Sequence, residues 1–92
     1  MKNNHQPNLC DQIIALAKKK CIDLDLRSLA MLSDRAILNN KEVAGVFIVT
    51  VRSLYTWRRS KGLSSSKFSN EHHYTWANVF DFLQNLHTPG EL

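Results

Sequence analysis

The sequence is poor in residues that interrupt regular structure, and it has no long apolar run. Three glycines and two prolines in 92 residues, with 43% apolar and 22% charged residues, argue against a wholly disordered chain. No run approaches the roughly 18 apolar residues of a membrane-spanning helix, and the start MKNNHQPNL lacks an apolar signal core. We therefore expect no membrane partner and a cytoplasmic protein. In that reducing compartment Cys10 and Cys21 would be packed thiols, with a disulfide as the alternative.

Motifs of enzymes and metal proteins are also missing. The chain has no glycine-rich phosphate loop, no HExxH or GxSxG and no close carboxylate pair, so we predict that it is not an enzyme and uses no cofactor. Its histidines and cysteines do not fall at zinc-finger spacings, which predicts that no metal is bound. These residues are His5, Cys10, Cys21, His72, His73 and His87.

Acidic residues are absent between Arg52 and Lys67, a stretch that holds five of the twelve lysines and arginines. The formal net charge is +4 and the isoelectric point about 9.3, which permits binding to nucleic acid or to an acidic membrane surface. Five of the eight acids lie in the first half of the chain. The positive charge is therefore concentrated, and this stretch is the candidate for contact with a polyanion.

The first third of the chain predicts helices. Asn8 can cap a helix that continues at helical spacing to about residue 20, where Lys18–Lys20 suit the negative end of the helix dipole or, alternatively, a phosphate. The segment CIDLDLRSLAML alternates like a strand and also fits a helix. We predict a short helix capped by Asp25.

LNNKEVAGVF has the pattern of a helix start. Asn39 can accept a hydrogen bond from the amide of Glu42, Glu42 can accept one from the amide of Asn39, and Leu38 can pack on Val43. This capping box with a hydrophobic staple predicts a helix over 40–47 with Val43, Ala44 and Phe47 facing inward.

The segment VTVRSLYTWRRSKG predicts an amphipathic, cationic helix over 51–61, which Thr50 caps and Gly62 closes in a left-handed conformation. With Leu54 at the centre of the buried face, Val51 and Trp57 fall within about 60° of it. Arg58 falls near the boundary of that face. The opposite side and its flanks carry Arg52, Ser53, Tyr55, Thr56, Arg59 and Ser60.

The last part of the chain predicts a small hairpin followed by a helix. Two strands, at about 67–69 and 72–74, would meet in a turn at Asn70 and Glu71. Thr75 can cap a final helix with an apolar stripe that ends before TPG. Phe80 lies off that stripe, which suggests contact with the N-terminal segment or with a partner. The stripe consists of Trp76, Val79, Phe82, Leu83 and Leu86.

In their order, these segments resemble a known family. Residues 38–83, reading L..KEVA....VTVRSLYTWRR..GL...KF.....HYTW..V..FL, look like the excisionase-like and MerR-like winged helix-turn-helix DNA-binding domains of bacteria. The resemblance covers about half of the chain. It implies a mainly α fold with a small β-hairpin wing, in which helix 51–61 lies in a DNA major groove and the wing at 67–74 lies on the adjacent backbone or minor groove.

The chain departs from the family pattern at three positions. Ile48 stands where glycine or asparagine is usual, and a left-handed conformation there costs a β-branched residue about 1–2 kcal/mol. Ser64 replaces a proline before the wing, and His73 replaces the arginine before the wing tyrosine. These departures predict a strained turn, a looser connection to the wing and a DNA affinity below the family's.

The resemblance and the charges together give the candidate DNA contacts. Lysine and arginine displace counterions from phosphates, and arginine reads guanine in two hydrogen bonds. We expect base readout by Arg52, Ser53 and Thr56. Phosphate or groove-edge contacts are expected from Tyr55, Arg58, Arg59, Lys61, Lys67 and His73. Arg58 has the alternative of bracing the fold through an internal acid, and the tryptophans Trp57 and Trp76 are expected in the core rather than stacked on bases.

The expected organisation is a helical extension over 1–36, a winged helix-turn-helix domain over 37–87 and a tail over 88–92. By analogy with small proteins of mobile elements, we expect an accessory factor of recombination or a small transcription regulator, associated with a bacterial nucleoid. Duplex DNA is the expected partner. A recombinase or integrase, and a homodimer or cooperative assembly on DNA, are left open. The alternative function is a protein-interaction module that docks a recombinase through Phe80 and the N-terminal helices, with little DNA binding.

Overall fold

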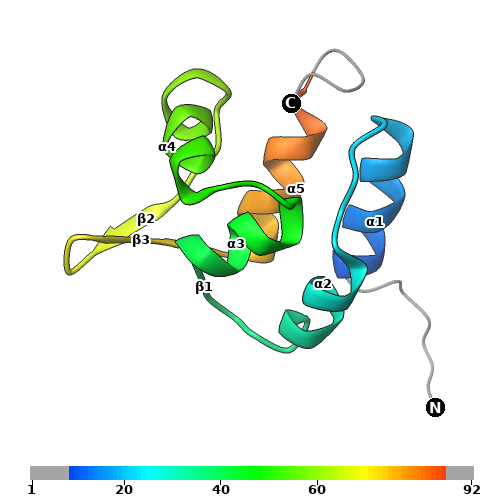
Figure 1. The fold of residues 1–92 in the computed structure, drawn as a ribbon, viewed down its shortest axis with the longest axis horizontal. Coiled ribbons are helices and arrows are strands. Elements are labelled where there is room, and N and C mark those ends of the chain that lie inside the picture. Colours follow the sequence, from blue (N-terminus) through cyan, green and yellow to red (C-terminus); the bar gives the residue numbers. More distant parts are fainter. Residues whose placement is uncertain (1–8, 87–92) are drawn as a thin grey trace.

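A computed structural model describes residues 9–86 of the chain as mainly helical with a small three-stranded antiparallel sheet. The elements are α1 (Leu9–Lys19), α2 (Leu26–Leu32), β1 (Leu38–Asn39), α3 (Asn40–Phe47), α4 (Val51–Ser60), β2 (Ser66–Phe68), β3 (Glu71–Tyr74) and α5 (Trp76–Gln84). In Figure 1, α4 and the hairpin β2–β3 lie on one side, α1 and α2 on the other, and α5 between them.

Four helices begin at the capping residues that the sequence predicts. Asp25, Asn39, Thr50 and Thr75 all have extended backbones, and the side chain of each accepts from an amide in the first turn that follows. The capping box of α3 is confirmed, because Asn39 Oδ1 accepts from the Glu42 amide at 2.8 Å and the Asn39 amide donates to Glu42 Oε1 at 2.9 Å. The expected cap of α1, at Asn8, lies outside the described residues.

An aromatic cluster joins α3, α4 and α5. The rings of Phe47 and Trp57 meet edge to face with centroids 5.3 Å apart, and Trp57 stacks on Phe82 at 5.2 Å. Aromatic pairs in these arrangements contribute more than their buried area alone. Trp57 and the stripe of α5 are therefore in the core, as predicted.

The N-terminal helix α1 belongs to the same core. Its residues Cys10, Ile13 and Ala17 are buried in one cluster with the helices that follow, and α1 packs along α5. Lys20 Nζ donates to the carbonyls of Gln84 and Leu86. This lysine of the predicted triplet thus fastens the end of α1 to the end of α5.

The sheet differs from the predicted hairpin in two ways. It has three strands in the order β1–β3–β2, because Leu38 pairs with Tyr74 and Asn39 with His73. The hairpin turn also lies one residue earlier than predicted, at Ser69 and Asn70, both with left-handed φ (53° and 66°). A two-residue turn of this kind matches the twist of the strands, and asparagine tolerates the conformation better than the glutamate that the prediction placed there.

The turn between α3 and α4 takes the left-handed conformation at Ile48, with φ 58° and ψ 46°. The amide of Val49 donates to the Ala44 carbonyl at 2.9 Å, and the amide of Ile48 donates to the Gly45 carbonyl at 3.2 Å. These two bonds satisfy the last carbonyls of α3. The predicted strain at Ile48 is therefore present, and the geometry of a glycine-type cap is kept despite it.

Candidate nucleic-acid interface

Helix α4 is fixed to the core by Leu54 and Trp57, which are 0% and 6% exposed. Val51 was predicted to join them, but it is 40% exposed, so that prediction is wrong. The reason is its place in the first turn. Helical side chains lean towards the N-terminus, so Val51 leans off the beginning of α4 rather than onto the residues below it. It lines a depression between α4 and the hairpin instead.

The opposite side of α4 is exposed and cationic. Arg52, Thr56 and Arg59 are all exposed there, as predicted, while Ser53 is half-buried. The amide of Ser53 donates to Thr50 Oγ1 at 3.2 Å, which completes the cap, and the Thr56 hydroxyl lies 3.5 Å from the Arg52 carbonyl. This face presents two guanidinium groups and a hydroxyl with no carboxylate in α4.

Tyr55 supports Arg59 on the flank of this face. Arg59 Nη1 donates to the Tyr55 hydroxyl at 3.0 Å, and the Arg59 guanidinium lies 5.6 Å from the centre of the tyrosine ring. Arg58 lies 5.9 Å from the same ring. Because one aromatic ring attracts both cations, it limits the orientations they take without neutralising either charge.

Arg58 connects three elements instead of projecting outward. Its Nη1 donates to the hydroxyl of Tyr74 in β3 at 2.5 Å and to Asn40 Oδ1 in α3 at 3.2 Å, and the Tyr74 hydroxyl donates to the same Asn40 oxygen at 2.6 Å. The prediction allowed Arg58 an internal acid as partner, which is wrong in kind, because the partners are a phenol and an amide. Burial raises the pKa of Tyr74, and the hydrogen bond from Arg58 acts in the opposite direction.

The hairpin brings further basic groups beside α4. Lys67 is exposed on β2 and pairs with His72 across the strands, while Lys61 is half-buried at the end of α4. Burial, followed by the charges of Arg58, Lys67 and His73, lowers the pKa of His72. Its Nδ1 lies 2.7 Å from the Ser65 hydroxyl.

His73 occupies a different environment from His72. It lies on the other face of β3, where its ring meets Phe68 edge to face at 5.9 Å, and its Nδ1 is buried with no hydrogen-bond partner within residues 9–86. The two adjacent histidines therefore face different surroundings, as the alternation of a strand predicts.

Four residues of this region were not among the predicted site residues: Asn40, Lys41, Asn70 and Glu71. Asn40 holds Arg58 and Tyr74, and Lys41 and Asn70 line the depression of about 310 Å³ that Val51 borders. Glu71 lines it too and is the only acid of the hairpin. No local pattern signals this grouping, because it depends on the pairing of β1 with β3.

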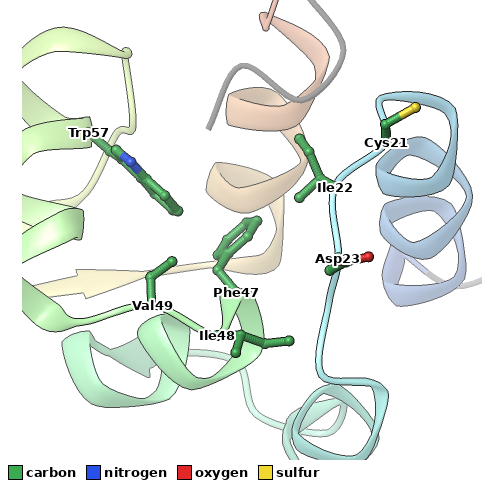
Figure 2. A pocket seen from close by; sticks show the side chains of 7 residues that line it. All are labelled: Cys21, Ile22, Asp23, Phe47, Ile48, Val49 and Trp57. Atoms are coloured by element: carbon green, nitrogen blue, oxygen red, sulfur yellow. The ribbon is translucent and has the colours of Figure 1, made fainter.

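A second pocket lies behind the turn between α3 and α4 (Figure 2). It has a volume of about 300 Å³ and mostly apolar walls, and the side chains of Cys21 and Asp23 point away from Phe47. Its lining residues are Cys21, Ile22, Asp23, Phe47, Ile48, Val49 and Trp57.

Comparisons of the chain with protein-family models, with curated proteins and with solved structures find no match. Across residues 9–86, no three histidine, cysteine or acidic side chains are grouped so that they would hold a metal ion. None of the helices in that range is both long enough and apolar enough to cross a membrane.

Proposed function

We propose that this chain binds double-stranded DNA, with α4 in a major groove and the hairpin β2–β3 on the adjacent backbone or minor groove. The observation that carries the proposal is the exposed, acid-free face of α4, on which Arg52, Thr56 and Arg59 lie opposite the buried Leu54. A helix of this width fits a major groove, and its arginines can pair with phosphates or with guanine edges.

The contacts of Arg58 support the same proposal. Because Arg58 is held by Tyr74 and Asn40, the hairpin is fixed to α4 and to α3. A helix and a wing held at a constant spacing would engage neighbouring grooves together, and less ordering would be needed on binding. In this proposal Arg58 positions the wing, while Arg52, Arg59 and Lys67 contact the duplex.

The finer proposal is a winged helix-turn-helix protein of the excisionase-like or MerR-like kind, serving as a recombination accessory factor or a small transcription regulator. It is supported by the order α3, turn, α4, hairpin, α5, and by the left-handed turn residue Ile48 and the closing Gly62, whose φ is 79°. A recombinase would then be a second partner, and adjacent copies would assemble on neighbouring sites.

The test is selection of bound fragments from a random duplex pool, followed by fluorescence anisotropy on the recovered duplex at about 50 and 200 mM salt. Arg52→Ala combined with Arg59→Ala is expected to weaken binding by about 100-fold and to reduce the salt slope by roughly two, because each arginine contributes about 1–3 kcal/mol and displaces about one counterion. The matched control is Lys18→Ala with Lys19→Ala, which removes two exposed charges from α1.

The control is expected to bind like the unaltered chain. Equal loss in both double variants would mean that only net charge matters, and unchanged binding after loss of Arg52 and Arg59 would exclude α4 as the reading helix. Failure of the unaltered chain to retain any duplex at low salt would contradict the proposal and favour the protein-interaction module.

A further inference from the structure

Phe68 is the feature of the hairpin that binding by charge alone does not explain. Its side chain is 70% exposed, although phenylalanine is usually buried. It is the last residue of β2, directly before the Ser69–Asn70 turn, on a hairpin that extends beyond α4 at the edge of the molecule (Figure 1). The core does not require an aromatic side chain at this position, so the ring is free to contact a ligand.

The surroundings of Phe68 form an apolar depression with one lysine, Lys67, in its lining. The depression has a volume of about 370 Å³, and Ile37 beside it is 54% exposed. The His73 ring lies edge-on to Phe68 and holds it from one side. The lining residues are Ile37, Ser66, Lys67, Phe68 and His73, none of them acidic.

The charge around Phe68 selects the kind of partner. Residues 49–70, which run from the turn before α4 to the hairpin turn, contain five basic residues and no acidic one. Glu71 is opposite Phe68 in the strand register and lines a neighbouring depression together with Lys41. The hairpin itself carries one lysine and one glutamate, Lys67 and Glu71, and the other basic residues of this stretch lie on or directly after α4. An exposed aromatic ring beside such a basic helix is complementary to a nucleic acid, which offers phosphates and flat apolar bases together.

We propose that Phe68 inserts between adjacent base pairs from the minor groove and so bends the duplex. The proposal rests on the DNA-binding function proposed above. Apolar side chains used as wedges in a minor groove unstack one base step and kink the duplex by about 20–90°. The tight turn with left-handed Ser69 and Asn70 and the ring of His73 hold the wedge in place before binding.

In this proposal, α4 and Phe68 contact different grooves of the duplex. Arg52 and Arg59 on α4 would bind the major groove, and Phe68 would act in the adjacent minor groove through the hairpin that Arg58 connects to α4. Because the hairpin does not move freely relative to α4, insertion of Phe68 forces the duplex to bend. The chain would therefore bend its DNA site as well as bind it.

The experiment uses the full chain and a duplex recovered from the random pool. Energy transfer between dyes at the two duplex ends reports bending, and 2-aminopurine placed at successive steps reports unstacking. The unaltered chain is expected to shorten the end-to-end distance and to raise the fluorescence at one step. Phe68→Ala is expected to abolish both signals and to weaken binding ~10-fold. Phe68→Leu keeps an apolar wedge and is expected to retain both.

Met31→Ala is the matched control, because Met31 is 77% exposed on α2, on the other side of the molecule from the hairpin. It is expected to bend DNA like the unaltered chain. A straight duplex in the bound state, or bending that survives Phe68→Ala, would overturn the inference while leaving duplex binding intact. If Phe68→Ala left bending unchanged but abolished binding of a protein partner, the inference would also be wrong, and the depression would be a protein-docking site. If the unaltered chain binds no duplex, both proposals are wrong.

Discussion

Nη1 of Arg58 lies 2.5 Å from the hydroxyl of Tyr74, and through this hydrogen bond α4 holds the central strand of the sheet. Both groups also meet Oδ1 of Asn40, at 3.2 and 2.6 Å, so the start of α3 is included. Tyr74 is fully buried, and a buried hydroxyl that lacks hydrogen bonds destabilises the folded state. Arg58 is therefore one of the residues that set the position of the hairpin relative to α4.

Replacing Arg58 with alanine is expected to destabilise the fold by about 2 kcal/mol, because hydrogen bonds to a charged group contribute about 1.5–3 kcal/mol. Urea denaturation followed by circular dichroism measures the change. Arg52→Ala, which removes an exposed arginine from the same helix, is the control and is expected to change stability by less than about 0.5 kcal/mol. Equal effects of the two substitutions would show that the contacts of Arg58 contribute nothing specific.

The role of Arg58 also shows what sequence reasoning can reach. The helix starts at Asp25, Asn39, Thr50 and Thr75 were predictable, because a cap and its first turn are neighbours in the sequence. The grouping of Arg58 with Tyr74 was not, because it joins residues 16 positions apart through a strand pairing that has no local signal.

The same limit explains the two strand errors. β1 is only two residues long, too short for an alternating pattern, and it exists because β3 lies beside it. The hairpin turn was placed one residue late because Ser69, Asn70 and Glu71 are all polar, and only the backbone geometry distinguishes them. The exposed face of α4 was largely predictable, since helical periodicity sets it, apart from Val51 at the helix start.

Ile48→Gly is expected to stabilise the protein by about 0.5–1 kcal/mol. The left-handed conformation costs a residue with a β-carbon about 1–2 kcal/mol, and glycine removes this cost. Glycine also gives the unfolded chain more conformational freedom, which reduces the gain in stability by about 0.5–1 kcal/mol. Little apolar burial is lost, because Ile48 is 64% exposed. Urea midpoints provide the measurement. Ile48→Ala keeps the β-carbon and serves as the control, so a similar gain from alanine would refute the strain explanation.

Ile13→Ala is expected to cost about 3 kcal/mol, the usual range for truncating a fully buried isoleucine. Ile13 is 0% exposed in α1, where that helix packs along α5. The same substitution at Ile37, which is 54% exposed, is the control and is expected to cost less than about 1 kcal/mol. Thermal or urea unfolding of both variants decides the matter. A small effect at Ile13 would mean that α1 contributes little to the stability of the domain.

The stability of the fold is expected to depend on His72 at mildly acidic pH. Its pKa in the folded state is lowered, so the unfolded chain binds a proton more readily than the folded chain does. The contribution of neutral His72 is therefore complete above its ordinary pKa of 6.5 and is lost as the pH falls through 6.5 towards the folded-state value. Urea midpoints between about pH 7.5 and 5 measure this slope. His72→Gln should reduce the pH dependence of the urea midpoint, whereas His73→Gln should leave the contribution of His72 unchanged. If the pH dependence persists in His72→Gln, another group causes it.

Lys41 and Glu71 are expected to act in opposite directions on DNA binding. Both line the depression between α3, the start of α4 and the hairpin turn. In the proposed complex with DNA, the phosphate strand that runs from the major to the minor groove passes this depression. Lys41→Ala should weaken duplex binding and reduce the salt slope by about one, since one phosphate contact is lost. Glu71→Gln should strengthen binding, because it removes the only acid of the hairpin.

Anisotropy titrations over a salt series test both substitutions, with Arg27→Ala on α2 as the charge control. If Glu71→Gln weakened binding, or if Lys41→Ala changed it no more than Arg27→Ala did, the phosphate path would not run through this depression, and contact would be limited to α4.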